Sequence, residues 1–206
     1  MFYSSATIAP PPTTAPSGPT GVPPHHCTTI GQTRGVTDGD DPDADRTADG
    51  RYIVVRGRRW RATDPSIPEN LRTELVRALM TGRREVKSKG DIARVMVHDA
   101  KVALGERGDP WWEPTEQGTR DRLAATMRTL LRVRGQGSIC PSDAARVVGG
   151  DRWRDLMGAA RSVALCLRDE GVVSITRQGA PVTGAEIAGP IRIIAGDALE
   201  FRPSAG

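Results

Sequence analysis

The sequence predicts an α+β protein with three parts: a disordered N-terminal tail, a small hairpin-plus-helices unit, and a C-terminal domain of helices and strands. Three observations predict these parts. Residues 1–49 are rich in Pro, Thr, Gly and Asp. Strand-forming residues then flank a two-residue loop, Arg56-Gly57. From residue 119 onward, apolar residues recur at helical spacing. We therefore place the parts at residues 1–49, 50–115 and 119–196.

The tail cannot bury enough apolar surface to offset the entropy of ordering its backbone, so we expect it to be disordered. It contains the cluster His25-His26-Cys27. Two histidines and one thiol in a loose chain are more often inert than metal-binding, since a zinc site needs about four ligands. The abrupt change in composition near its end also suggests the hypothesis that Val36 is the true start of translation.

The composition of the whole chain argues against a membrane protein, a secreted protein and a metalloprotein. The chain has 206 residues, of which 37% are hydrophobic, and a formal net charge of +4. No window reaches the roughly 18 apolar residues of a membrane span, and the N-terminus does not resemble a signal peptide. The three cysteines, Cys27, Cys140 and Cys166, show no Cys-x-x-Cys spacing. An odd cysteine count fits a reducing cytosol. We expect a cytoplasmic protein without a metal or cofactor.

The middle unit, residues 50–115, begins with a hairpin. Its two strands, Tyr52–Val55 and Arg58–Arg61, are joined by the loop length that hairpins favour. This register places Ile53 opposite Trp60 on one face. Because a lone hairpin is unstable, we expect it to lean on the helices that follow.

Two helices complete the middle unit. The first begins at Pro68, which suits a first helical turn, and its apolar positions recur at helical spacing: Leu71, Leu75, Ala78 and Leu79. The second runs from about Ile92 to Leu104, with Val97 and Ala100 also facing inward, and Gly105 ends it. The segment Asp109–Pro114 then reads as a loop with two anchoring aromatics, Trp111 and Trp112.

The C-terminal domain begins with a helix from Thr119 to about Gly135. Its apolar stripe consists of Leu123, Met127, Leu130 and Leu131. Ile139 forms a short extended link, and a short second helix follows from Pro141 to Val148.

A third, longer helix is capped by Asp151 and ended by Gly171. Between Trp153 and Leu167, its apolar residues recur at spacings of three and four. Two strands, Val172–Arg177 and Ile191–Ile194, complete the domain. Three helices, the middle one short, followed by a two-stranded wing are the order of a winged helix-turn-helix domain.

Three runs in this domain resemble the bacterial family known as domain of unknown function 3253. They are Ser138–Arg146 (SICPSDAAR), Trp153–Met157 (WRDLM) and Gly189–Arg192 (GPIR). The resemblance covers roughly Thr119 to Ile194 and implies a winged-helix fold. It implies no activity, substrate or catalytic residue.

Winged helices often bind duplex DNA with the third helix in the major groove and the wing against phosphates. Two aspartates, Asp155 and Asp169, interrupt the basic stripe of this helix. Residues 111–206 carry 13 basic and 11 acidic groups, a net charge of only +2. Since phosphate neutralisation supplies most non-specific affinity, this domain alone should bind weakly. Its candidate nucleic-acid contacts are Arg152, Arg154, Arg161 and Arg168 on the helix and Arg177 and Arg192 on the wing.

The hairpin holds the densest basic cluster, Arg56, Arg58, Arg59 and Arg61 beside Trp60. Arginines next to an exposed aromatic side chain can grip a nucleic-acid backbone. The position of Trp60 opposite Ile53 instead favours a structural role for this ring. Our preferred hypothesis is that the hairpin arginines clamp a nucleic-acid backbone and compensate for the weakly charged third helix.

The remaining reactive residue types do not form a recognisable catalytic site. Cys140 lies at the start of a helix, where the helix field can activate a thiol, although such a cysteine more often packs. Cys166 lies beside the apolar stripe and is expected inside. His98 shares a helical face with Lys101 but lacks an identifiable orienting partner and nucleophile.

The sequence therefore predicts a nucleic-acid-binding accessory protein or regulator, with DNA or RNA as its partner. The alternative is a protein-interaction module that binds no nucleic acid. An enzyme that uses the region around His98 is the least favoured interpretation.

Overall fold

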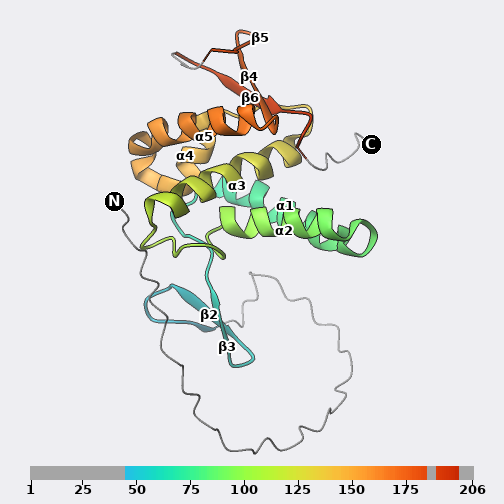
Figure 1. Cartoon of the computed structure of the whole chain (residues 1–206). Helices are drawn as coiled ribbons and strands as arrows, with labels where there is room; N and C mark the ends of the chain where they lie inside the picture. Colours follow the sequence, from blue (N-terminus) through green and yellow to red (C-terminus); the bar gives the residue numbers. More distant parts are fainter. Residues whose placement is uncertain (1–44, 185–188, 200–206) are drawn as a thin grey trace, which may run out of the picture. The chain divides into compact units, whose positions relative to one another are not determined.

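The structure, a computed structural model, describes residues 45–184 and 189–199 and has an α+β fold with two antiparallel sheets (Figure 1). The predicted α+β class is confirmed. The cluster His25-His26-Cys27 and residue Val36 lie outside the described residues. The elements in chain order are β1 (Asp45–Arg46), β2 (Tyr52–Val55), β3 (Arg58–Arg61), α1 (Glu69–Lys89), α2 (Asp91–Ala103), α3 (Glu116–Arg134), α4 (Pro141–Gly149), the 3-10 helix η1 (Gly150–Leu156), α5 (Met157–Asp169), β4 (Val173–Arg177), β5 (Ala180–Pro181) and β6 (Arg192–Ala195).

The first sheet has the order β1-β2-β3. The predicted hairpin register is confirmed, with Ile53 opposite Trp60. Strand β1 lies within residues 1–49, which were assigned to the tail, and it pairs with β2; the tail boundary stays a prediction. A turn fixes this pairing: the backbone N–H of Tyr52 donates to the Thr47 hydroxyl at 3.1 Å. That turn brings β1 alongside β2.

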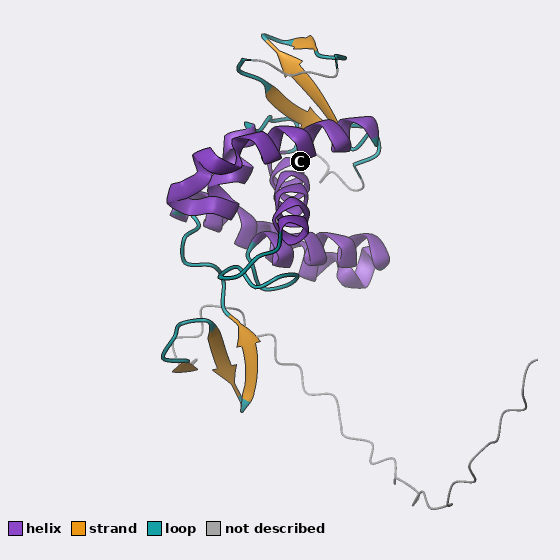
Figure 2. Cartoon of the chain, turned by 60° about the vertical axis from the view of Figure 1, so that its left-hand side comes forward, coloured by secondary structure: helices purple, strands orange, loops and turns teal. Residues whose placement is uncertain are grey.

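Helices α1 and α2 follow the predicted apolar spacing, and Leu71, Leu75, Ala78 and Leu79 are all buried. Gly82 lies where the two helices approach closely: a Cβ there would lie 3.0 Å from a methyl group of Val97. The two helices lie side by side in Figures 1 and 2. Gly90, with φ of +55°, separates them.

Helix α3 begins three residues earlier than predicted, because the Thr115 hydroxyl accepts a hydrogen bond from the Gly118 N–H at 3.0 Å and caps it. The apolar core runs through the middle unit and the C-terminal part alike. The predicted division at residues 50–115 and 119–196 stays a prediction. The largest fully buried side chains include Leu75, Leu104, Leu123, Met127, Leu130, Leu131, Ile139, Ile175 and Ile193.

The third helix does not begin as predicted. Asp151 makes no side-chain cap, and the chain first forms the 3-10 helix η1, within which Arg152 has non-helical backbone angles. The preceding turn explains this entry. Gly150 has φ of +51°, and a Cβ on it would lie 2.9 Å from the Cβ of Ser66. The α-helical part therefore begins only at Met157.

The second sheet has the order β5-β4-β6 and is drawn in orange in Figure 2 beside the helices. Strand β5 was not predicted; it is two residues long and ends in Pro181, a residue type confined to sheet edges. The extended link at Ile139 was predicted, and it bridges to Ile193. The elements from α3 to β6 thus follow the predicted order, and their assignment as a winged helix stays a prediction.

Replacing Gly196 by Ala should destabilise the protein. A Cβ there would overlap the carbonyl oxygen of Gly171 and lie 2.9 Å from the carbonyl carbon of Val172. Because the neighbours are backbone atoms, we expect a loss of about 1–3 kcal/mol in the free energy of unfolding, the usual effect of overpacking.

The matched control is Gly158→Ala on α5, where nothing lies within 4 Å of the added methyl group. It should be neutral or gain about 0.5–1 kcal/mol, since Ala is the better helix former. Urea unfolding of both variants measures the two effects. A Gly196→Ala variant as stable as Gly158→Ala would contradict the close approach.

Candidate nucleic-acid interface

The hairpin sheet has two faces of different character. Side chains alternate along a strand, and residues directly opposite each other share a face. Tyr52 and Arg61 therefore lie on one face. Ile53 and Trp60 lie on the other.

The Tyr52 face is closed by the loop that carries the paired tryptophans, as the sequence predicted for these anchoring aromatics. The rings of Tyr52 and Trp112 meet edge to face at 5.6 Å. The Trp111 indole N–H donates to the carbonyl oxygen of Ala62 at 3.1 Å. Arg61 Nη1 donates to the carbonyl oxygen of Gly108 at 2.7 Å. Arg61 thus ties the sheet to this loop.

The Trp60 face carries an exposed aromatic side chain. Trp60 is 46% exposed, and the guanidinium carbon of Arg58 lies 5.0 Å from its ring centroid. The prediction of a buried structural tryptophan is therefore wrong. Its partner Ile53 is only half-buried, and the contacts of the tryptophan loop are made on the opposite face of the sheet.

Positive charge dominates this sheet. Residues 45–61 contain six arginines and two aspartates. The guanidinium of Arg59 lies 4.3 Å from the ring centroid of Tyr52, and that of Arg51 lies 4.9 Å from Trp112. Arg56, Arg58 and Arg59 are exposed. Exposed guanidinium groups interleaved with aromatic rings are a chemistry suited to phosphates and stacked bases.

The arginines at the start of the third helix are exposed but engaged with neighbouring side chains. Arg152 Nε lies 3.6 Å from a carboxylate oxygen of Asp155. Trp153 lies between two arginines, with Arg154 at 4.6 Å and Arg146 at 4.4 Å from its ring centroid.

Two arginines farther along α5 bind the segment between β5 and β6. Arg161 Nη2 donates to the carbonyl oxygen of Gly189 at 3.0 Å, and Arg168 Nη1 donates to that of Gly184 at 2.7 Å. Arg154, Arg161 and Arg168 are spaced seven residues apart and were expected to share one face of a single α-helix. Arg154 instead lies in the 3-10 helix η1, so the three do not belong to one continuous α-helix. On the second sheet, Arg177 of β4 is half-buried and Arg192 of β6 is exposed.

Sequence reasoning missed a buried ion pair between the middle unit and α3. Arg122 Nη1 lies 2.8 Å from Asp64 Oδ2, and the two side chains are 8% and 3% exposed. Arg122 Nε also donates to the carbonyl oxygen of Ala103 at 3.1 Å. Fifty-eight positions separate the two partners, so no local pattern signals the pair.

A second buried carboxylate, Asp99 on α2, binds two arginines of α3. Arg128 reaches both of its oxygens, at 3.0 Å from Nε and 2.6 Å from Nη2. Arg132 Nη1 donates to Asp99 at 2.5 Å.

A third network is centred on Arg134 at the end of α3. Its guanidinium binds both oxygens of Glu74, at 2.8 and 2.9 Å. It also binds Asp143 on α4 at 2.9 Å. In each network guanidinium groups of α3 bind carboxylates, so the three networks connect α3 to α1, α2, α4 and the loop before α1.

The cysteines and His98 form no site within the described residues. Cys166 was expected inside and is exposed, since it is rotated by one residue from the buried Leu167. Cys140 is half-buried, and its N–H donates to Asp143 at 3.1 Å. His98 is exposed, with Nδ1 at 3.1 Å from Arg107 Nη1.

Within residues 45–184 and 189–199, no three potential metal ligands lie together. Across the same ranges, no helix combines the length and the apolar character that crossing a bilayer requires.

Comparison with known families agrees with the resemblance seen in the sequence. Residues 120–195 match the family described as "Protein of unknown function (DUF3253)". The matched segment runs from within α3 to the end of β6 and leaves out the hairpin sheet. No curated protein matches the chain.

Proposed function

We propose that this chain binds single-stranded nucleic acid, DNA or RNA, through the Trp60 face of the hairpin sheet. The observation that carries this proposal is Trp60, which is 46% exposed and lies beside Arg58 on a strand of exposed arginines. Stacking of a base on an aromatic side chain contributes about 1–3 kcal/mol and tolerates any sequence. The neighbouring guanidinium groups neutralise phosphates, the main source of non-specific affinity.

The hairpin is a better candidate than the third helix for the primary contact. Arg161 and Arg168 already donate to carbonyl groups of the wing loop, so a phosphate would have to compete with these bonds. The exposed Arg152, Arg154 and Arg192 remain available for secondary contacts. In this proposal the winged helix is the scaffold of a binding protein, either an accessory factor or a regulator.

Removing the Trp60 ring should weaken single-strand binding. We expect Trp60→Ala in the full chain to raise the Kd for a fluorescent oligothymidylate about tenfold, because about 1.4 kcal/mol of stacking corresponds to a factor of ten.

Replacing Arg56 and Arg58 together by Gln should weaken the salt dependence of binding. The slope of log K against log salt concentration should fall by up to about 1.4, at about 0.7 per phosphate contact on a single strand. Fluorescence anisotropy at several salt concentrations measures both effects.

The matched control is Arg152→Gln with Arg154→Gln, which removes two exposed arginines from η1. It should leave the affinity within about twofold of the wild-type value, because the proposed primary contact lies on the hairpin sheet and η1 makes only secondary contacts. If this control loses affinity while Trp60→Ala binds like the wild type, the site lies on the third helix and our assignment is wrong. If the wild type binds no strand even at low salt, the proposed function itself is wrong.

One observation favours the alternative of a protein-interaction module. On α2, Ile92 is 45% exposed and Val95 is 42% exposed. Residues three apart share a helix face, so these two side chains form a small apolar patch. Replacing both by Ser should leave nucleic-acid affinity unchanged and should weaken any protein complex that uses this patch.

A further inference from the structure

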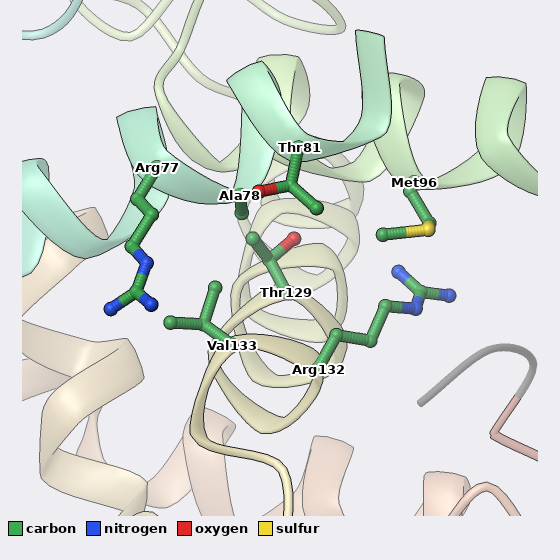
Figure 3. Close-up of a pocket in the computed structure, with 7 residues that line it drawn as sticks. All are labelled: Arg77, Ala78, Thr81, Met96, Thr129, Arg132 and Val133. Carbon is green, nitrogen blue, oxygen red and sulfur yellow. The ribbon is translucent and has the colours of Figure 1, made fainter. Parts of the chain in front are cut away.

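A pocket with a volume of about 200 Å³ lies between α1, α2 and α3 (Figure 3). Three kinds of group line it. Figure 3 shows two arginines at opposite ends, two threonines between them, and apolar side chains around these. The lining residues are Arg77, Ala78 and Thr81 on α1, Met96 on α2, and Thr129, Arg132 and Val133 on α3.

The Thr129 hydroxyl has no hydrogen-bond partner among the described residues, although the residue is only 2% exposed. A threonine within a helix usually donates to a backbone carbonyl one turn earlier, and Thr126 does so, to Arg122 at 2.7 Å. Thr129 does not. Figure 3 shows its hydroxyl directed toward Thr81. A buried hydroxyl left unpaired is costly, so this atom requires a partner inside the pocket.

Among the residues that the structure describes, the charged groups that line the pocket are both positive. Arg132 is 5% exposed as a side chain and is held in place by Asp99. Arg77 is exposed and makes no ion pair with any residue that the structure describes. Within residues 45–184 and 189–199, no carboxylate lines the pocket. The pocket therefore offers a fixed guanidinium, a second one on a free side chain, and two hydroxyl groups.

We propose that this pocket binds a small organic acid. The carboxylate pairs with the Arg77 guanidinium and accepts from the Thr129 hydroxyl, while Arg132 adds positive potential from the opposite end. The apolar body of the acid packs against Met96 and Val133. A cavity of about 150 Å³ accommodates benzene, so a pocket of about 200 Å³ fits one ring with a carboxylate. This proposal is independent of nucleic-acid binding.

The test uses two probes of equal size, benzoate and its neutral isostere benzamide, titrated into the full chain by calorimetry. We expect benzoate to bind saturably and about tenfold more tightly than benzamide, the ratio that about 1.4 kcal/mol of charge pairing gives. Arg77→Gln should reduce the affinity for benzoate to that for benzamide. Arg94→Gln on α2 is the control, since Arg94 is exposed and absent from the lining.

A second variant separates a ligand-binding hydroxyl from a structural one. Thr129→Val removes the unpaired hydroxyl at equal volume, so the midpoint of thermal unfolding of the ligand-free protein should stay the same or rise. Its affinity for benzoate should fall about fivefold, the equivalent of one hydrogen bond. Saturable benzoate binding that falls in both variants supports the proposal. The proposal is wrong if the wild type shows no saturable binding, if benzoate and benzamide bind equally, or if Thr129→Val lowers stability and leaves the benzoate affinity unchanged.

Discussion

Replacing Asp64 by Asn should lower the free energy of unfolding by about 3–5 kcal/mol, the usual cost of breaking a buried ion pair. The variant would leave Arg122, whose side chain is 8% exposed, without its carboxylate. Burial already lowers the pKa of Arg122, and the Asp64 charge opposes that shift. Two remaining acceptors, the carbonyl oxygens of Ala103 and Val147, are neutral and cannot replace a charge.

Asp64 also holds the loop before α1. Its Oδ1 accepts from the N–H of Ser66 at 2.9 Å and from the Ser66 hydroxyl at 2.7 Å. Asparagine keeps the shape of the side chain and can still accept these bonds. The loss in the Asn variant therefore reports the ion pair, and a further loss in Asp64→Ala would report the loop.

Equilibrium unfolding in urea measures this effect, and Asp91→Asn is the matched control. Asp91 pairs with Arg94 on α2, but the two side chains are 90% and 69% exposed. Such exposed pairs contribute about 0–1 kcal/mol. An Asp64→Asn variant that lost no more stability than Asp91→Asn would show that the Arg122 charge is solvated in solution.

Replacing Asp99 by Asn should cost about 3 kcal/mol at neutral pH, because two arginines lose one buried carboxylate. Arg132 is almost fully buried, whereas the Arg128 side chain is 27% exposed and remains partly hydrated. The cost should therefore come mainly from Arg132.

The stability contributed by Asp99 should also depend on pH in a defined direction. Burial alone raises the pKa of Asp99, but the hydrogen bonds and charges of Arg128 and Arg132 outweigh it and hold that pKa below 3.8. A carboxyl group with a depressed pKa stabilises the fold above its unfolded pKa, and this stabilisation is lost as pH falls through the folded value. The difference in unfolding free energy between wild type and Asp99→Asn should stay constant from neutral pH to about 5. It should narrow at pH values below about 3.9, the pKa of an Asp carboxyl in the unfolded chain.

Urea unfolding of both proteins at several pH values checks this dependence, since other carboxyl groups titrate equally in the two and cancel. If the difference in unfolding free energy is the same at neutral pH and at a pH of about 3, the stability that Asp99 contributes does not depend on its charge.

Much of the fold was predictable because local rules determine it. The recurrence of Leu71, Leu75 and Leu79 at helical spacing predicts α1, and the loop Arg56-Gly57 predicts the hairpin register. Both arguments need only residues close together in sequence. The family match of residues 120–195 likewise follows from contiguous runs.

What the sequence could not predict depends on partners far away along the chain. The exposure of Trp60 depends on which face of the sheet the tryptophan loop covers, and that loop lies about 50 residues later. The entry into η1 depends on the approach of Gly150 to Ser66. The arginine partners of Asp64 and Asp99 lie on α3, more than 25 residues later in the sequence. These long-range contacts produce no periodic pattern of residues in the sequence.

The ion pairs made by α3 connect the matched family segment to residues that precede it in the chain. Arg122, Arg132 and Arg134 lie within residues 120–195, but carboxylates that they bind, Asp64, Asp99 and Glu74, all precede it. The segment therefore cannot be transplanted into another chain unchanged. A protein that carries it without such a preceding part must supply other acids or replace these arginines by neutral side chains. Substitutions at these three positions should accordingly track the presence of the neighbouring part.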